Sequence, residues 1–244
     1  MIIPSRNDIR HKRYLFLLLR EILKNPLLSV SLMFKGGTYA SLRGILKRFS
    51  VDLDFDLLDT SKQNLIRKEC YKIFKNLGLD IKDESKKYLQ FFLKYSAPEG
   101  LRNTLKFEVN DKPSKYNLYE KVYLNQVNMF CNGQTLGTVF ANKLVACKAR
   151  FEKNNNKIAG RDFYDIHQFF MEGIKVNKLV VEDLSSLPYK TYLESLILFI
   201  QKHLTEKLIN QDLNPLLEQG EINKILPTLK DDLLFMIDNE IKNI

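Results

Sequence analysis

The 244-residue sequence has no tryptophan, only three cysteines and three histidines, and no long apolar run. The cysteines are widely spaced and form neither a CxxC pair nor a cluster with histidine, which argues against a zinc site or a disulfide framework. No stretch approaches the length of a membrane span. Charged residues interrupt the apolar run near the N-terminus, which favours an amphipathic helix over a signal peptide. We therefore expect a cytoplasmic protein with reduced core thiols and no membrane partner. These thiols belong to Cys70, Cys131 and Cys147.

Glycine and proline are also sparse, at ten and seven residues. With 45% hydrophobic and 27% charged residues, this composition argues against wholesale disorder and allows one large core or two modest ones. Lysine and arginine outnumber aspartate and glutamate by 38 to 29, which gives a net charge of +9. A basic balance favours a polyanionic partner through phosphate contacts and counterion release.

The hydrophobic periodicity divides the chain into two parts. Up to about residue 135, a first helix over 7–24 is followed by alternating helices and strands; after Gly137 the period changes to 3.6 and the chain is mostly helical. We therefore predict an α+β domain over 1–135 and an all-helical domain over 136–244. The remaining expected elements of the first part are strands at 27–34, 51–58, 88–95, 103–109 and around 120–130, a short helix after the glycine pair, and a helix at 61–77.

The segment VDLDFDLL carries three aspartates at alternate positions: Asp52, Asp54 and Asp56. Residues i and i+2 of a strand project from the same face, so these carboxylates repel one another unless a positive charge lies between them. Two such carboxylates are typical ligands of Mg²⁺ or Mn²⁺, which leave coordination sites for substrate phosphates. Glu108, at an alternate position of a neighbouring candidate strand, is the candidate third ligand, whereas Asp56 is expected to be a flanking charge.

A glycine pair, Gly36 and Gly37, ends the preceding strand, and Thr38 follows as the expected cap of a short helix. Such a turn lets backbone amides approach a phosphate closely. Ser50 either donates a hydroxyl to the same phosphates or ends a turn. The nearby cations either neutralise a triphosphate or form a solvated helix face; they are Arg43, Lys47 and Arg48.

Three stretches resemble a known family. KGGTYASLRGILKRFSVDLDFD is similar to the signature of the AbiEii-type toxin nucleotidyltransferases of the polymerase-β-like superfamily, and ANKLVACKAR and GRDFYDIHQFF match two further family elements in the expected order. The resemblance implies a small mixed sheet that carries the acidic pair, followed by a helical domain. It also implies metal-dependent transfer of a nucleotide from an NTP to an acceptor, such as the 3′ end of a tRNA, by a toxin with a cognate antitoxin.

Carried over residue by residue, the resemblance makes Asp52 and Asp54 metal ligands. It makes Lys143 a phosphate-binding or catalytic lysine, and Asp162 the essential acid of the last element. The residues implied in nucleotide binding are Gly36, Gly37, Thr38, Ser50 and Lys143. Two positions depart from the family pattern without removing a ligand: Tyr39 follows the GGT, and Val51 precedes the acidic pair.

The last element also has structural explanations. Asp162 near a helix N-terminus complements free amides and the helix dipole, and Asp165 shares its face at i+3. Arg161 is spaced to pair with Asp165, and Lys143 and Arg150 are seven residues apart and can face one anionic cleft. One of the aspartates then orients Lys143 instead of touching substrate. His167 lies beside them and is expected to be a packing or supporting residue, not a catalytic one.

Two rival functions stay open at this stage. The first is nucleotidylation of a protein hydroxyl on the same fold. The second is a non-catalytic nucleic-acid or partner-binding protein that kept the fold and lost the chemistry. Both candidate metal ligands, Asp52 and Asp54, are present, which favours an enzyme.

Overall fold

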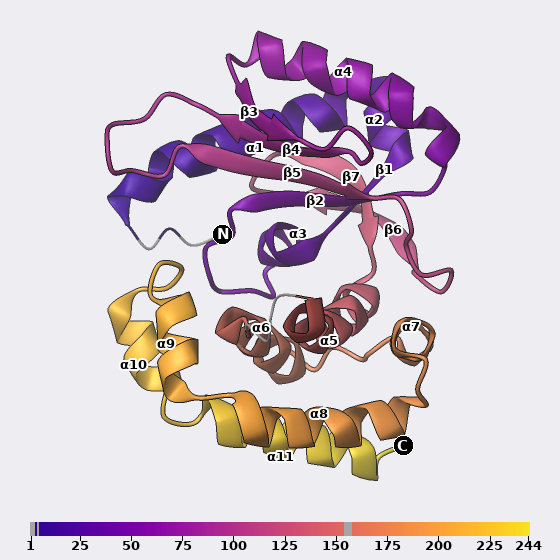
Figure 1. Cartoon of the computed structure of the whole chain (residues 1–244), viewed down its shortest axis with the longest axis vertical. Helices are drawn as coiled ribbons and strands as arrows, with labels where there is room; N and C mark the ends of the chain where they lie inside the picture. The colour runs from indigo at the N-terminus through magenta and orange to yellow at the C-terminus, as the bar shows by residue number, and fades with distance from the viewer. Residues whose placement is uncertain (1–2, 4, 154–157) are drawn as a thin grey trace. The chain divides into compact units, whose positions relative to one another are not determined.

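The computed structural model describes residues 3, 5–153 and 158–244. The chain divides into two compact units (Figure 1). Unit 1 consists of residues 1–44, 48–113 and 118–135, and unit 2 consists of 45–47, 114–117 and 136–244. Within the described ranges, no helix is long and apolar enough to cross a bilayer.

Unit 1 is built on a seven-stranded mixed sheet in the order β3-β4-β5-β2-β1-β7-β6. The central strand β2 runs antiparallel to β1 and parallel to β5, and β1 runs parallel to β7. In Figure 1, α1, α2 and α4 lie on one side of this sheet and α3 on the other. The strands are β1 (Leu32–Lys35), β2 (Asp52–Leu57), β3 (Asp80–Glu84), β4 (Gln90–Lys94), β5 (Thr104–Asn110), β6 (Tyr119–Leu124) and β7 (Met129–Gln134). The helices are η1 (Arg6–Asp8), α1 (Ile9–Lys24), α2 (Pro26–Ser31), α3 (Gly36–Leu42), η2 (Thr60–Lys62) and α4 (Gln63–Asn76).

The core of unit 1 is aromatic. Phe55 on β2 stacks on Phe34 at 4.9 Å between ring centroids and contacts Phe107 at 5.6 Å. Phe74 of α4 meets Phe91 of β4 edge-to-face at 5.1 Å. These rings alternate along their strands with polar residues, so one face of β2, β4 and β5 is buried while the other presents charged side chains.

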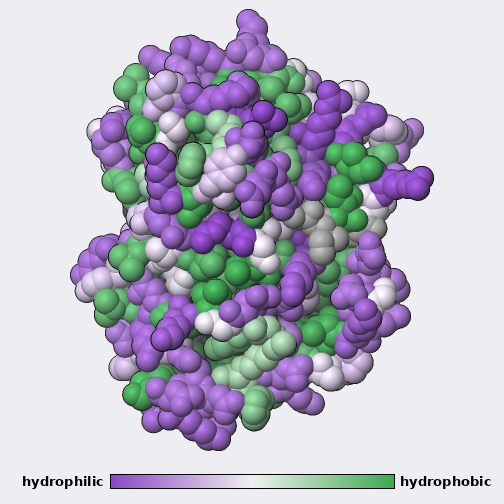
Figure 2. All heavy atoms as spheres, turned by 180° about the vertical axis from the view of Figure 1, so that it is seen from behind, coloured by the Kyte–Doolittle hydropathy of each residue, from purple (hydrophilic) through white to green (hydrophobic). Residues whose placement is uncertain are grey.

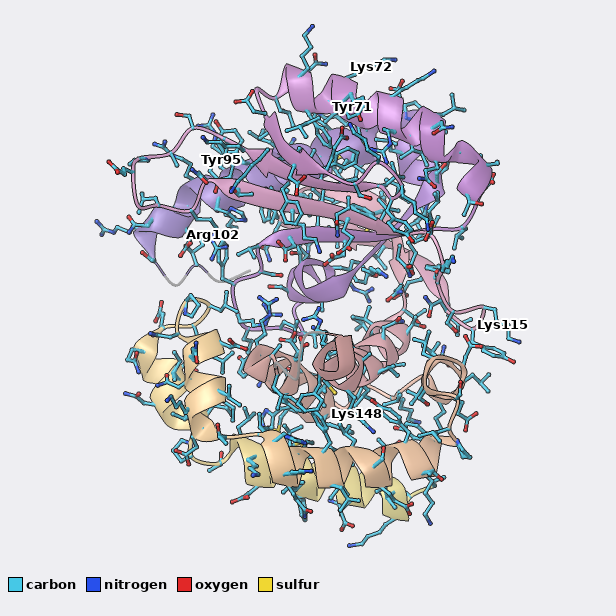
Figure 3. The ribbon with its side chains drawn as sticks, viewed as in Figure 1. Tyr71, Lys72, Tyr95, Arg102, Lys115 and Lys148 are labelled. Atoms are coloured by element: carbon cyan, nitrogen blue, oxygen red, sulfur yellow. The ribbon has the colours of Figure 1, made fainter. Side chains whose placement is uncertain are left out.

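His11 fixes α1 to the start of β2. Its imidazole is fully buried, Nε2 donates to the Val51 carbonyl at 2.8 Å, and Nδ1 lies 2.7 Å from the Tyr95 hydroxyl. The Tyr95 hydroxyl also lies 3.0 Å from the Arg102 carbonyl, and both residues are labelled in Figure 3. Burial lowers the pKa of His11 to about 4, so the imidazole is neutral at pH 7.

Two predicted elements of unit 1 need correction. The apolar run 27–34 is mainly the helix α2, because Pro26 occupies its first turn and the Asn25 side chain accepts from the amides of Leu27 and Leu28. The expected strand around 120–130 is the hairpin of β6 and β7. Strand β3 was not predicted, because it is a charged, exposed edge strand without apolar alternation.

Unit 2 is helical over its main segment. Its helices are α5 (Leu136–Lys153), α6 (Gly160–Met171), α7 (Lys178–Ser185), α8 (Tyr189–His203), α9 (Glu206–Leu213), α10 (Gln219–Ile225) and α11 (Leu229–Lys242). Part of the predicted loop 153–160 lies outside the described residues. Lys148 of α5, labelled in Figure 3, reaches α8, where its ammonium donates to Ser195 Oγ at 2.8 Å and lies over the Tyr192 ring. The helical prediction for the second half of the chain agrees with these elements.

The surface and the cysteines fit the composition. In Figure 2 the end of unit 1 that carries α4 is largely hydrophilic, in keeping with the exposed lysines Lys68, Lys72 and Lys75. The cysteines are free and buried, and burial raises the pKa of each thiol to about 12. The expected position of the three thiols in the core is therefore confirmed.

Candidate active site

The glycine pair joins β1 to α3 at the edge of the acidic face of the sheet. Gly36 has φ +78°, which disfavours any residue with a side chain, and a Cβ there would lie 2.5 Å from Asp54 Oδ2. A Cβ on Gly37 would lie 2.9 Å from Arg48 Nη2 and 3.0 Å from Ser50 Oγ. Asp54 therefore approaches the backbone of Gly36, and Arg48 and Ser50 approach that of Gly37, so a side chain at either glycine would displace a candidate site residue.

Thr38 does not cap α3. The helix begins at Gly36, so Thr38 lies within the first turn and is fully buried. Its hydroxyl donates to the Asp52 carbonyl and lies 2.9 Å from Ser50 Oγ. Thr38 thus links the glycine turn to the first residue of β2, and its hydroxyl is engaged in hydrogen bonds within unit 1.

Asp52 and Asp54 lie on the same face of β2, as the alternation predicts, and both are partly exposed. In the register of the sheet, Asp54 stands opposite Lys35 of β1 and Glu108 of β5. Burial, followed by the negative charge of Asp52, raises the pKa of Asp54 to about 6, and Glu108 adds to the effect. Lys35 and Lys106 oppose this rise without cancelling it. The face therefore carries excess negative charge around Asp54.

Glu108 is already engaged by its neighbours on the sheet. Gln90 Nε2 donates to its Oε1 at 2.8 Å, and the Lys106 ammonium pairs with its Oε2. Lys106 was not predicted as a site residue, although its position two residues before Glu108 on the same strand face could have revealed it.

Asp56 has a different role from the flanking charge that we expected. Its side chain is fully buried, and its carboxylate forms an ion pair with Lys35 Nζ at 2.7 Å. It also accepts from Asn110 Nδ2 at 3.2 Å, Tyr119 hydroxyl at 3.0 Å and Gln134 Nε2 at 2.7 Å. Asp56 therefore connects β2 to four other strands and holds the Lys35 ammonium beside the acidic pair. Lys35 was missed, although it directly precedes the glycine pair.

The predicted residues of unit 2 form a charged cluster within that unit. Lys143 Nζ lies 3.0 Å from Asp162 Oδ1 and 2.9 Å from Asp165 Oδ2, and both aspartate side chains are fully buried. Arg150 Nη1 lies 3.0 Å from the other oxygen of Asp162. The seven-residue spacing of Lys143 and Arg150 thus places both on Asp162, as the shared helix face predicts. Arg161 lies in the first turn of α6 and is partly exposed.

The flanking cations divide between the two units. Arg43 of unit 1 donates to the Tyr39 hydroxyl at 2.6 Å and pairs with Glu120 at 2.7 Å. Arg48, also in unit 1, is buried, and its guanidinium lies against the Gly37 backbone. Lys47 of unit 2 is exposed and pairs with Glu172 at 3.2 Å. Only Arg48 is thus brought to the glycine turn of unit 1.

The donor set at β2 fits a divalent cation in its chemistry. Two carboxylates share one strand face, and burial, followed by the charge of Asp52, disfavours the ionised form of Asp54, which a bound cation would stabilise. Among the described residues, however, no three histidine, cysteine, aspartate or glutamate side chains converge in a metal-binding arrangement. Glu108 as third ligand therefore stays a prediction.

Comparison with known proteins relates this arrangement to a family. The sequence model described as "Nucleotidyl transferase AbiEii toxin, Type IV TA system" matches residues 17–238. No curated protein matches the chain significantly.

Two solved structures share the fold. JHP933 from Helicobacter pylori has a TM-score of 0.60 at 21% identity, over 98% of this chain and 94% of that one. MenT4, a nucleotidyltransferase toxin from Mycobacterium tuberculosis, has a TM-score of 0.55 at 16% identity, over 95% of this chain and 84% of that one. The predicted fold class, a nucleotidyltransferase core followed by a helical region, is confirmed.

Proposed function

Since the chain belongs to the AbiEii family of nucleotidyl transferase toxins of type IV toxin–antitoxin systems, we propose that it transfers a nucleotide from an NTP to a hydroxyl of RNA, such as the 3′ end of a tRNA. We further propose that the reaction needs Mg²⁺ or Mn²⁺. The observation that carries this proposal is the Asp54 carboxylate, packed against Gly36 beside Asp52 with a pKa raised to about 6.

In this proposal, Asp52 and Asp54 hold the cation on the exposed face of β2. When bound there, a divalent cation would neutralise the triphosphate and favour attack by an acceptor oxygen at the α-phosphorus, with release of pyrophosphate. Lys35 stays next to the carboxylates because the buried Asp56 binds its ammonium. This fixed positive charge limits the repulsion within the acidic pair.

The glycine turn supplies the phosphate-binding part of unit 1. Gly37 has no side chain, so its backbone can come close to the Arg48 guanidinium and to Ser50 Oγ. A guanidinium and a hydroxyl beside a glycine-rich turn are suited to phosphate oxygens. We propose that Arg48, Ser50 and the backbone of Gly36 and Gly37 bind the triphosphate.

The role of unit 2 in this proposal follows from its family elements. We propose that Lys143 contributes to phosphate binding and that Asp162 and Asp165 are positioning residues. Both carboxylates contact the Lys143 ammonium, and Arg150 completes the charge balance at Asp162.

The basic balance of the chain, +9, supports an RNA acceptor over a protein acceptor, because phosphate neutralisation favours polyanions. A family of toxin–antitoxin systems implies a cognate antitoxin as a further partner. We propose that both RNA and this antitoxin bind the chain in the cytoplasm.

The test is a labelling assay with the full chain, Mg²⁺ and each α-³²P-labelled NTP, with and without total tRNA. We expect label in RNA from the wild type and from Asp80→Asn, a matched control on the exposed edge strand β3. We expect at least a hundredfold less label from Asp54→Asn. Label on protein alone would transfer the proposal to a protein acceptor. No label under any condition, with RNA binding that survives Asp54→Asn, would overturn the enzyme assignment.

A further inference from the structure

Unit 2 contains a pocket of about 310 Å³ that the proposed reaction does not use. All of its lining residues belong to unit 2. Its volume is at the lower end of the range for small-molecule sites, ~300–1,000 Å³, so it suits one ring system or a nucleoside and not a long polymer. The lining residues are Lys47, Tyr164, His167, Gln168, Met171, Glu172, Leu217, Glu221, Lys224 and Ile225.

One wall of the pocket is a stripe along α6. Tyr164, His167, Gln168 and Met171 are spaced i, i+3, i+4 and i+7, so they share one face of the helix. Tyr164 and His167 are buried, Gln168 is nearly so, and Met171 is 62% exposed at the end of the helix. This wall therefore combines an aromatic ring, a flexible apolar side chain and two polar groups. Such a combination suits a flat ring with a polar edge.

The two polar groups of this wall fix one another. Gln168 Nε2 lies 3.3 Å from His167 Nδ1, and because an amide nitrogen can only donate, Nδ1 accepts. The neutral imidazole then carries its proton on Nε2, which lies 3.7 Å from Asp232 Oδ2, too far for a direct hydrogen bond. Within the described part of the chain this buried Nε2 has no hydrogen-bond partner. Burial lowers the pKa of His167, in keeping with a neutral ring.

The Asp232 carboxylate, on the Nε2 side of the ring, independently favours a proton on Nε2, which leaves Nδ1 to accept from the Gln168 amide. Gln168 is therefore held in one amide orientation. Its carbonyl oxygen and its second amide hydrogen are a donor–acceptor pair of known order, which is the type of group that reads the edge of a base. A glutamine whose amide could rotate by 180° would present donor and acceptor in either order, and it would not distinguish one base from another.

The charges around the pocket cancel in pairs. Lys47 pairs with Glu172 at 3.2 Å, and Lys224 pairs with Glu221 at 2.7 Å. Leu217 and Ile225 supply apolar surface between them. A ligand that enters this pocket therefore meets no net charge, which disfavours a phosphate and favours an uncharged ring.

We propose that this pocket binds a nucleobase, stacked on Tyr164 and read by the Gln168 amide. The inference rests on the proposed function, because both an NTP and an RNA acceptor present such a base. Either source offers the same chemistry to the pocket.

The test uses nucleosides, which carry no phosphate for the acidic face or the glycine turn of unit 1. The full chain, labelled with ¹⁵N-histidine, gives ring-nitrogen signals from three imidazoles, those of His11, His167 and His203, and His167→Gln assigns the pair that belongs to His167. We expect at least one of adenosine, guanosine, cytidine and uridine to shift the His167 signal saturably. The signals of the other two histidines should not move.

Two variants should weaken this binding at least tenfold. Gln168→Ala removes the reading group, and Met171→Trp fills the pocket from a residue exposed enough to spare the core. Gln211→Ala, an exposed glutamine of α9, is the matched control and should bind like the wild type. If no nucleoside shifts the His167 signal, or if both pocket variants bind as well as the control, the proposal is wrong.

Kinetics then separate the two sources of the base. A raised KM for the NTP in Gln168→Ala assigns the pocket to the substrate, and a raised KM for RNA assigns it to the acceptor. Because nucleoside binding needs no turnover, failure of the labelling assay leaves this test intact. Conversely, a wild-type labelling result with no nucleoside binding overturns the pocket alone.

Discussion

The two units of this protein both bury aspartates, but they balance the charge differently. In unit 2, Asp162 and Asp165 meet two cations, Lys143 and Arg150, at 2.9–3.0 Å. In unit 1, four carboxylates share the face of β2 and β5 with two lysines. The carboxylates of unit 1 are Asp52, Asp54, Asp56 and Glu108, and its lysines are Lys35 and Lys106.

The charges of the cluster in unit 2 are therefore balanced, whereas the carboxylates in unit 1 outnumber their lysines. A buried carboxylate with a matched cation stabilises its surroundings only while both partners remain. A carboxylate that is desolvated by burial and also lies among like charges has a raised pKa, as Asp54 does, and gains from a further cation. The same residue type therefore fixes a lysine side chain in unit 2 and, in the proposed function, binds a metal in unit 1.

The largest expected effect comes from breaking the balanced cluster. Lys143→Ala removes the ammonium that pairs with both buried carboxylates, Asp162 and Asp165, so we expect the free energy of unfolding to fall by about 3–5 kcal/mol. Urea unfolding measures this loss. Lys148→Ala on the same helix is the matched control, since the Lys148 ammonium donates to Ser195 and lies over the Tyr192 ring without pairing to a carboxylate among the described residues, and it should cost about 1 kcal/mol or less. Equal losses in the two variants would show that the cluster carries no special energy.

In unit 1 we expect substitution of a charged residue to raise the free energy of unfolding instead of lowering it. A pKa raised from 3.8 to about 6 means that ionised Asp54 destabilises the metal-free fold at pH 7 by about 3 kcal/mol, at ~1.4 kcal/mol per pH unit. Asp54→Asn should therefore leave the stability of the EDTA-treated protein unchanged or increase it by up to that amount. The same variant should lose the rise in Tm that Mg²⁺ gives the wild type. A destabilised variant with an intact Mg²⁺ response would contradict both expectations.

The pH dependence of stability sharpens the comparison further. The pKa of His11 falls from 6.5 in the unfolded chain to about 4 in the fold, so the unfolded state takes up the proton first and stability is lost as the pH drops from 6.5 towards 4. Asp54 acts in reverse, because its folded carboxyl is protonated first between pH 6 and 3.8. In metal-free protein the two partly cancel. Between pH 7 and 5, Asp54→Asn should lose about 1 kcal/mol more stability than the wild type.

Identical losses in the two proteins would contradict the raised pKa of Asp54. Urea midpoints at the two pH values provide the measurement, and Asp80→Asn, on the exposed edge strand, should follow the wild type.

The smallest effect is expected at Glu108. Because Gln90 and the Lys106 ammonium already bind its two oxygens, Glu108→Gln should lower transferase activity only a few-fold, less than about 1 kcal/mol in activation free energy. Steady-state kinetics beside Asp54→Asn provide the measurement. A loss as large as that of Asp54→Asn would instead establish Glu108 as the third metal ligand.

Local periodicity predicted much of this fold. The half-buried strands β2, β4 and β5 alternate apolar and polar residues, so their faces could be assigned from the chain alone. The run 27–34 was misassigned because a capping asparagine and a proline outweighed its apolar character. Strand β3 has no buried apolar face, so no local pattern predicts it, and it is recognised only in the structure, by its pairing with β4.

The same distinction applies to the site. The i, i+2 spacing put Asp52 and Asp54 on one face, and the helix spacing put Lys143 and Arg150 on a common partner. The burial of Asp56 depends on Tyr119 and Gln134, which lie 63 and 78 residues away in the chain. No local pattern reports contacts of that range, which is why Asp56 was interpreted as a flanking charge and Lys35 was missed.

The position of β7 beside β1 also means that the sheet of unit 1 is completed late in the synthesis of that unit. Asp56 and Lys35 are made early, but Gln134, which binds the Asp56 carboxylate, is the last residue of the final strand of the sheet. A nascent chain shorter than this lacks part of β7, one of the two strands that flank β1, and one donor to the buried Asp56 carboxylate. Residue 134 must therefore leave the ribosome before the Asp56 carboxylate, which holds Lys35 beside the acidic pair, has its full set of donors.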